Sequence, residues 1–176
     1  LRLDVASARV TVSGTKGNLW VDAGSGGLDV RDVSGDEITL ETGSGGVQVH
    51  GLSGRRLKLD TGSGGLNGGS ITADELNADV GSGSIRLDDV KVSRAKFDAG
   101  SGGIQVSLTA PIKSLDVDAG SGGVTISLPA NLGAEVDIET GSGGIDTDFP
   151  VQVTRMERHH LRGRIGEGAG HIRIES

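Results

Sequence analysis

The sequence of 176 residues has no cysteine and no tyrosine, one tryptophan, two phenylalanines and no long apolar run. No disulfide can form, but this leaves the cellular compartment open, because envelope proteins also occur without disulfides. With no apolar stretch of about 20 residues, we expect no membrane span, and no signal peptide is recognisable. Only Trp20, Phe97 and Phe149 are aromatic, so few residues could serve as a stacking platform for sugars.

Acidic residues outnumber basic ones, 24 to 17, and the formal net charge is -7. This balance disfavours nucleic acid as a partner, because phosphate neutralisation requires clustered Lys and Arg. Residues 151–176 differ, since their arginines outnumber their glutamates. We expect a solvated loop or cap there, with a contact site for anionic envelope polymers or lipid head groups as the alternative. The arginines are Arg155, Arg158, Arg162, Arg164 and Arg173.

What the sequence has in abundance is glycine, 32 residues of it, arranged in a regular repeat. The repeat is the tetrapeptide Gly-Ser-Gly-Gly, once Gly-Ser-Gly-Ser, at spacings of 19 to 21 residues. A short fixed period of this kind is typical of a solenoid, and it leaves room for only two or three short strands per unit. The tetrapeptides open at Gly24, Gly43, Gly62, Gly81, Gly100, Gly120 and Gly141.

Apolar residues keep fixed positions relative to the first glycine of each tetrapeptide. They stand five, three and one residues before it, and four and six residues after it, with polar residues between. This period of two indicates strands rather than helices. Glycine suits the corner because it reaches positive φ cheaply and lets neighbouring backbones approach closely. A second corner is predicted at Ser34-Gly35, Ser53-Gly54, Pro111, Pro129 and Asn131.

Equivalent residues of successive turns would stack about 4.8 Å apart and form ladders along the axis. Parallel strands joined by a crossover are right-handed in about 98 percent of cases. We therefore expect an all-β fold, a single right-handed parallel β-helix (β-solenoid) of about eight or nine turns, with 19–21 residues per turn. The single domain would span 1–176, with an irregular first turn at 1–18, seven repeats at 19–150 and an atypical C-terminal turn at 151–176.

One outward position, two residues before the tetrapeptide, is acidic in every repeat. Stacked carboxylates repel one another by about 0.9 kcal/mol per neighbouring pair even in water. The first interpretation is that each accepts hydrogen bonds from the amides or the serine hydroxyl of the next corner. The alternative is that divalent cations bridge successive turns, although the calcium-binding nonapeptide Gly-Gly-x-Gly-x-Asp is absent. The residues are Asp22, Glu41, Asp60, Asp79, Asp98, Asp118 and Glu139.

The corner serines form a second polar ladder: Ser25, Ser44, Ser63, Ser82, Ser101, Ser121 and Ser142. A catalytic serine needs a base within hydrogen-bond reach, and His50, His159, His160 and His171 do not recur with the serines. We therefore interpret the serines as structural. Adjacent histidines on a strand point to opposite faces, which disfavours a metal site. The sequence predicts no catalytic, cofactor-binding or metal-ligating residue, and no cofactor.

Right-handed β-helices include polysaccharide lyases and hydrolases, so a carbohydrate-active enzyme is the alternative function. Glycoside hydrolysis needs two carboxylates at a defined separation, one of them with a raised pKa. The acids here are instead spread evenly, one per turn. Trp20 is the one outward aromatic candidate for a sugar platform, and it is either an exposed contact or covered by the N-terminal strand.

The repeated pattern (Asp/Glu)-(Thr/Ala)-Gly-Ser-Gly-Gly-(Ile/Val/Leu) and the closing stretch from Gly163 to Ile174 resemble the bacterial adhesin-like or toast-rack domains of unknown biochemical function. The resemblance covers nearly the whole chain and implies a β-solenoid of the cell envelope with no known catalytic residues. From it we expect a non-enzymatic structural or adhesin-like module in the periplasm or at the cell surface, tethered through a segment outside this chain. The expected partners are an envelope protein or polysaccharide, and further copies of the chain joined through solenoid ends or faces.

Overall fold

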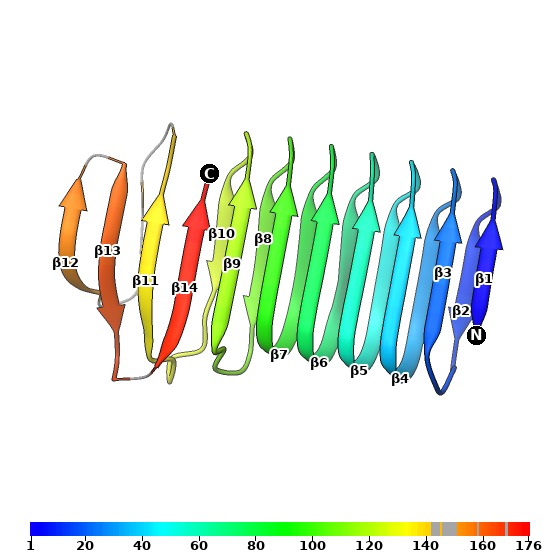
Figure 1. Ribbon diagram of the computed structural model, residues 1–176, viewed down its shortest axis with the longest axis horizontal. Helices are drawn as coiled ribbons and strands as arrows, with labels where there is room; N and C mark the ends of the chain where they lie inside the picture. The colour runs from blue at the N-terminus through cyan, green and yellow to red at the C-terminus, as the bar shows by residue number, and fades with distance from the viewer. Residues whose placement is uncertain (142–144, 146–150, 158, 168) are drawn as a thin grey trace.

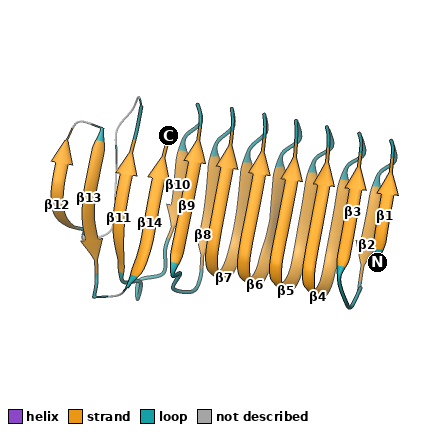
Figure 2. Ribbon diagram, viewed as in Figure 1, coloured by secondary structure: helices purple, strands orange, loops and turns teal. Residues whose placement is uncertain are grey.

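The computed structural model describes residues 1–141, 145, 151–157, 159–167 and 169–176. Among these residues, fourteen strands form one coiled sheet and there is no helix (Figures 1 and 2). The expectations for Ser142, Phe149 and Arg158 lie outside the described residues. The strands are β1 (Arg2–Val5), β2 (Val10–Ser13), β3 (Leu19–Ala23), β4 (Leu28–Thr42), β5 (Val47–Thr61), β6 (Leu66–Val80), β7 (Ile85–Ala99), β8 (Ile104–Leu108), β9 (Ser114–Ala119), β10 (Val124–Ser127), β11 (Ala134–Glu139), β12 (Gln152–Glu157), β13 (His160–Ile165) and β14 (Gly170–Glu175).

The chain coils as a right-handed parallel β-solenoid, as the sequence predicts. In Figure 1 it runs up the front, turns back at the glycine corners, descends behind and advances to the left with each turn. Strands β4 to β7 each cover 15 residues, because the chain bends from the back sheet into the front sheet without leaving the strand. Successive turns pair in register, so that Leu28 lies beside Val47 and Leu40 beside Leu59.

The solenoid has about seven turns rather than the eight or nine expected. The difference arises at the C-terminus, where residues 151–176 do not add a regular turn. Strands β12 and β13 pair antiparallel, and β13 pairs antiparallel with β11. Strand β14 then returns to lie parallel to, and between, β9 and β11. The arginine-rich stretch thus contributes strands to the C-terminal end of the sheet, so of the two expectations for it the structure supports the cap and not the solvated loop.

The core consists of the apolar columns that the repeat predicts. Residues five, three and one before each corner are buried, except Ile138, which is partly buried. Phe97 is fully buried beside Ala78 of the preceding turn, whose small side chain leaves room for the ring. The repeat alignment missed one further column at the second corner, where the side chains are at most 1% exposed: Val33, Leu52, Ile71 and Val90.

The second corner depends on one residue in the left-handed backbone conformation. The residue eight positions after the first corner glycine has a φ of 50° to 67° in four successive turns. The predicted Ser-Gly pairs stand two residues later, so the sequence interpretation placed this bend too late. Aspartate tolerates the left-handed region better than most residues, and a search for Ser-Gly pairs does not detect it. The four residues are Asp32, Gly51, Ser70 and Asp89.

The first and third glycines of the tetrapeptide are required because the preceding turn lies so close. In the six corners between Gly24 and Gly123, a Cβ on the first glycine would lie 2.3–2.5 Å from a carbonyl oxygen of the preceding turn, and one on the third glycine 1.7–2.2 Å. A Cβ on the fourth glycine would meet nothing nearer than 3.1 Å, which explains why Ser84 can stand there. None of the described glycines of the tetrapeptide has a positive φ, so that reason for glycine is wrong at this corner.

An eighth, degenerate corner precedes the seven in the sequence. The amide of Gly24 donates to the carbonyl of Val5, and the amide of Ser25 donates to that of Ala6, so residues 6–9 lie directly beside the corner at 24–27. Their sequence is Ala-Ser-Ala-Arg, with alanine where later corners have glycine. No other described turn stacks on the outer side of this corner, and both alanines are exposed.

Threonine stabilises two of the corners from inside. The Thr42 hydroxyl donates to the Gly26 carbonyl at 2.9 Å and accepts from the Gly45 amide at 3.3 Å. Thr61 repeats both bonds one turn later, at 2.8 and 3.2 Å. These threonines occupy the inward position that is Ala or Val in most other repeats, so a buried hydroxyl here satisfies backbone groups rather than a ligand.

Gly64→Ala tests the close approach of neighbouring turns. The added Cβ would lie 2.1 Å from the carbonyl oxygen of Gly45. Because the stacked backbones would have to separate, we expect a loss of about 1–3 kcal/mol or more in the free energy of unfolding. Gly65→Ala is the matched control, because its Cβ would meet nothing nearer than 3.4 Å, and we expect a change below about 0.5 kcal/mol. Urea unfolding measures both, and equal losses would contradict the explanation.

Candidate functional site

The front sheet is the broad side of the molecule and carries its most regular set of polar side chains. Its strand order is β1-β3-β4-β5-β6-β7-β9-β14-β11-β13-β12, with β4 to β7 contributing their C-terminal halves. We call each strand of this sheet a rung. Outward residues of neighbouring rungs lie side by side, about 4.8 Å apart, and form three ladders across the sheet.

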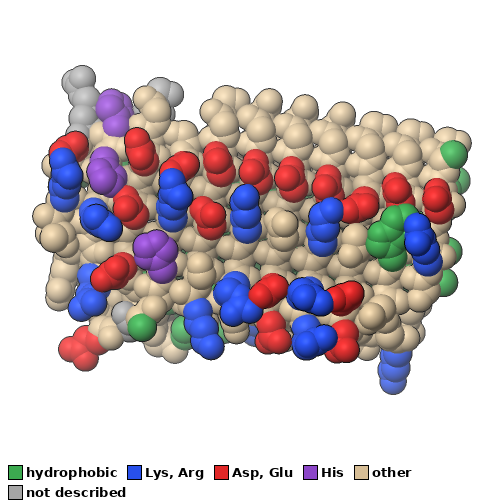
Figure 3. All heavy atoms as spheres, in the orientation of Figure 1, with side chains coloured by type: hydrophobic (Ala, Val, Ile, Leu, Met, Phe, Trp, Pro, Cys, Tyr) green, Lys and Arg blue, Asp and Glu red, His purple; other side chains and the backbone are tan. Residues whose placement is uncertain are grey.

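The first ladder is acidic along most of its length. It contains the predicted carboxylates from Asp22 to Asp118, with Asp4 added at one end and Glu175 inserted before Glu139. Their side chains face outward, as the alternation predicts (Figure 3). Among the described residues, none of them accepts a hydrogen bond from a corner amide or a serine hydroxyl, so that interpretation is wrong.

Basic side chains offset part of the repulsion within this acidic ladder. The Lys58 ammonium contacts Glu41 and lies 3.9 Å from a carboxylate oxygen of Asp60. Its hydrogen bond to Glu41 raises the pKa of Lys58, which keeps the ammonium charged. At the other end of the sheet, Arg173 pairs with Glu175 on the same strand. The repulsion within the acidic ladder is therefore reduced by basic side chains of the adjacent ladder.

The other two ladders alternate in charge from rung to rung. From β5 to β13, every second rung carries two basic side chains, and the rungs between carry one or two carboxylates and no basic group (Figure 3). The pattern therefore repeats about every 10 Å along the sheet. The alternation ends at the edge strand β12, where Arg155 lies in register with Arg162. The basic rungs are β5 (Arg56, Lys58), β7 (Arg94, Lys96), β14 (His171, Arg173) and β13 (Arg162, Arg164); the acidic rungs are β4 (Glu37), β6 (Glu75), β9 (Asp116) and β11 (Glu135, Asp137).

The inserted strand β14 is what continues this alternation beyond β9. Without it, Asp116 of β9 would lie beside Asp137 of β11, two like charges on adjacent rungs. In the structure Arg173 lies between them, paired in register with each. Hydrogen bonding to Glu175 raises the pKa of Arg173, and the charges of Asp116 and Asp137 raise it further. The alternation thus gives an electrostatic reason for the position of the C-terminal strand.

Ion pairs join basic rungs to the acidic rungs beside them. Arg56 pairs with Glu37, and Arg94 pairs with Glu75. Toward the C-terminus, Arg162 and Arg164 lie 3.7 Å from Asp137 and Glu135. His160 Nε2 lies 2.6 Å from Asp137 Oδ1. Because most of these pairs are well exposed, each contributes little to stability, and they leave the charged groups accessible to solvent.

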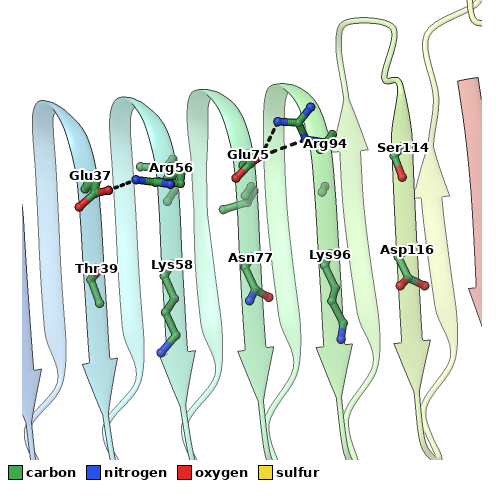
Figure 4. Close-up of a pocket in the computed structure, with 13 residues that line it drawn as sticks. Glu37, Thr39, Arg56, Lys58, Glu75, Asn77, Arg94, Lys96, Ser114 and Asp116 are labelled. Carbon is green, nitrogen blue, oxygen red and sulfur yellow. Dashed lines mark hydrogen bonds and ion pairs between the residues drawn. The ribbon is translucent and has the colours of Figure 1, made fainter.

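A groove of about 530 Å³ follows the alternating ladders over rungs β4 to β9. Its walls are the charged side chains from Glu37 to Asp116, and Leu57, Leu76 and Ala95 also line it. Asn77 lies between Lys58 and Lys96, one rung from each (Figure 4). This groove is the candidate functional site. Sequence reasoning missed it, because the alternation appears only when positions six and four before each corner are compared between repeats.

Trp20 is covered by the N-terminal strand and is not an exposed contact, which were the two alternatives that the sequence left for it. The Arg2 guanidinium lies 4.0 Å from the centre of the indole ring, and the side chain of Trp20 is partly buried. A cation stacked at this distance occupies one ring face. Phe97 is wholly inside the core, so neither of these described aromatics offers an open sugar platform.

The remaining candidate residues do not converge on a reactive centre. The corner serines from Ser25 to Ser121 are exposed, and the one side-chain hydrogen bond recorded for them runs from Ser25 to Ala6 at 3.5 Å. His50, His159 and His171 are exposed as well. Within the part of the chain that the structure describes, no group of three or more His, Cys, Asp or Glu side chains could hold a metal ion.

Two carboxylates outside the front sheet have shifted pKa values. A hydrogen bond from Arg31 lowers the pKa of Asp29. The hydroxyl of Thr109 donates to Asp89 at 2.9 Å, and this bond, followed by one from Lys91, lowers the pKa of Asp89. Both shifts favour the ionised carboxylate, which is the opposite of what a general acid requires.

Comparison with known proteins identifies the family. The model of the Toastrack DUF4097 family matches residues 7–176, so the chain belongs to this family, as the repeat and the closing stretch suggest. No curated protein and no solved structure matches the chain. In the described residues, no helix is long and apolar enough to cross a membrane.

Arg173→Glu tests whether charge alternation holds β14 in place. The variant puts a third carboxylate between Asp116 and Asp137, so we expect a loss of about 1 kcal/mol in the free energy of unfolding. The loss should shrink in high salt, which screens exposed charges. Arg31→Glu is the matched control, because Arg31 also pairs with an acid two residues away, Asp29, but has no carboxylate in register on either neighbouring strand. Equal, salt-independent losses would contradict this role.

Proposed function

We propose that this Toastrack domain is a non-enzymatic structural module that uses its front sheet to hold a polar partner, an envelope protein or a polysaccharide. The observation that carries the proposal is the regularity of the alternating ladders. Four basic rungs alternate with four acidic ones over a rigid, in-register sheet. Such a surface suits an extended partner that makes many small contacts rather than a small molecule enclosed in a pocket.

The carbohydrate-active enzyme is the alternative, and three observations weigh against it. The carboxylates of the acidic ladder are spaced evenly, with no pair set apart from the others. The carboxyl groups of Asp29 and Asp89 have lowered pKa values, whereas a glycosidase acid has a raised one. One face of the Trp20 ring is occupied by Arg2.

Incubation with a panel of envelope and plant polysaccharides separates the two functions. We expect the chain to retain at least one polymer in a pull-down without releasing reducing ends or unsaturated products, because the evenly spaced carboxylates of the acidic ladder set no catalytic pair apart. Cleavage that a single Asp substitution abolishes would instead establish the enzyme. Heat-unfolded chain is the control for non-specific retention.

We further propose that the module works outside the cytoplasm, in the periplasm or at the cell surface, tethered through a segment beyond these 176 residues. This rests on its kinship with envelope repeat domains. Fractionation of cells that make the natural protein tests it, and recovery of the protein only with cytoplasmic markers would contradict it.

Self-association through a solenoid end is part of the same proposal. Strands β1 and β12 are the two edges of the front sheet, and an unpaired edge can add a strand from another chain. At the N-terminal end, the methyl groups of Ala6 and Ala8 occupy the space that a stacked corner would need. The β12 end is the more receptive, because it exposes two large apolar side chains, Val153 (48%) and Met156 (70%), whereas the N-terminal end exposes one, Leu1 (60%).

Met156→Glu should therefore weaken self-association, whereas Leu1→Glu at the opposite end should not. Burying a charge in an edge-to-edge contact costs more than burying a thioether, so we expect the dimer dissociation constant to rise about tenfold or more. Sedimentation velocity over a range of concentrations measures this constant. A monomer at every concentration in the unmodified chain would contradict self-association.

A further inference from the structure

We propose that the groove over rungs β4 to β9 binds a linear polymer with one anionic group on every second unit, such as a polysaccharide in which acidic and neutral sugars alternate. The inference rests on the proposed function and names the ligand class of the same face. It is derived from the spacing of the basic rungs and from the acidic rungs between them.

The basic rungs set the spacing of the anionic groups. Arg56 and Lys58 stand on β5, and Arg94 and Lys96 stand on β7, with one rung between. Because neighbouring rungs are about 4.8 Å apart, the two basic pairs are separated by about 10 Å along the groove. A sugar in an extended polysaccharide advances the chain by roughly the width of one rung, so alternate sugars fall on alternate rungs.

The acidic rungs decide what the intervening units can be. Rung β6 presents Glu75 and Asn77, and rung β9 presents Asp116 beside Ser114. Asn77 can donate to and accept from hydroxyl or amide groups. A carboxylate on the intervening sugar would instead meet Glu75 or Asp116 at close range and be repelled. The groove therefore favours a polymer that is charged on alternate units over one that is charged on every unit.

The cations of the groove are accessible to such a ligand. The side chains of Arg56, Lys58 and Arg94 are 48% to 60% exposed. Arg56 and Arg94 each pair with a single carboxylate, Glu37 and Glu75, and a guanidinium has further N–H donors to offer. Among the described residues, no ion pair to Lys96 is recorded. Figure 4 shows Lys58 and Lys96 extending in the same direction, on either side of Asn77.

The test compares three soluble polymers binding to the full chain at low and moderate salt, measured by calorimetry. Hyaluronan carries a carboxylate on alternate sugars, polygalacturonate carries one on every sugar, and dextran carries none. We expect hyaluronan to bind about tenfold or more tightly than either of the others, because only its charges match the basic rungs and avoid the acidic ones. Binding should weaken as salt screens the contacts.

Two sets of variants test whether this groove is the site. Lys58→Glu with Lys96→Glu should reduce hyaluronan affinity about tenfold or more, because it places acids on the basic rungs. Arg86→Glu with Lys91→Glu is the matched control, since it changes the net charge equally at positions outside the groove. Glu75→Gln with Asp116→Asn should raise the affinity for polygalacturonate more than that for hyaluronan, because the carboxylates of polygalacturonate lie closer to the acidic rungs. Circular dichroism confirms that each variant is folded.

The outcomes separate this inference from the proposed function. Polygalacturonate or dextran binding as tightly as hyaluronan, or equal losses in the two charge-reversal variants, would overturn the alternating-charge ligand and leave a non-enzymatic binding module standing. No binding of hyaluronan at low salt would overturn it as well. Cleavage of any of the three polymers would contradict the proposed function itself.

Discussion

Backbone hydrogen bonding between successive turns is the constraint on which the rest of the structure depends. Turns that pair in parallel and in register must approach to about 4.8 Å along their whole length, corners included. At the glycine corner this leaves no space for a Cβ on the first or third residue, where a carbonyl oxygen of the preceding turn lies within 2.5 Å of its ideal position. The close approach of neighbouring backbones therefore explains why the first and third glycines recur in every repeat. The serine between them faces solvent. The alanines at residues 6 and 8 are consistent with this reason, because no described turn lies outside them.

The same stacking converts a one-dimensional repeat into a two-dimensional pattern of charge. Each outward position becomes a ladder, so a side chain in one turn interacts directly with the equivalent side chains of the two neighbouring turns. Along two of the ladders the sign alternates, and this offsets the cost of stacking like charges that the acidic ladder incurs. Arg173 extends the alternation where the regular turns end. The fold, the position of the C-terminal strand and the proposed ligand thus all rest on the registration of neighbouring strands.

Much of the fold could be predicted from the sequence because its information is local and repeated. The apolar columns, the outward acids and the right-handed solenoid follow from a period of two within a period of about 19 residues. The bend at Asp32 and Asp89 could not be found by looking for Ser-Gly pairs, because it uses a left-handed aspartate. The place of β14 could not be predicted either. Its Ile172 and Ile174 fit an inward column, but no local sequence signal indicates that they pair with residues of β9, 57 positions earlier in the chain. The groove was missed for the same reason, since it depends on comparing repeats two turns apart.

Cysteine pairs measure the position of β14 most directly, since the chain has no cysteine of its own. If β14 lies between β9 and β11, positions 118 and 175 are on adjacent rungs, about 4.8 Å apart, whereas 118 and 139 are two rungs apart, about 10 Å, beyond the reach of a disulfide. Under mild oxidation, Asp118→Cys with Glu175→Cys should form an intramolecular disulfide, and Asp118→Cys with Glu139→Cys should not. Efficient closure of the second pair and failure of the first would show β9 paired directly with β11, and would remove the alternation of charge on which this account rests.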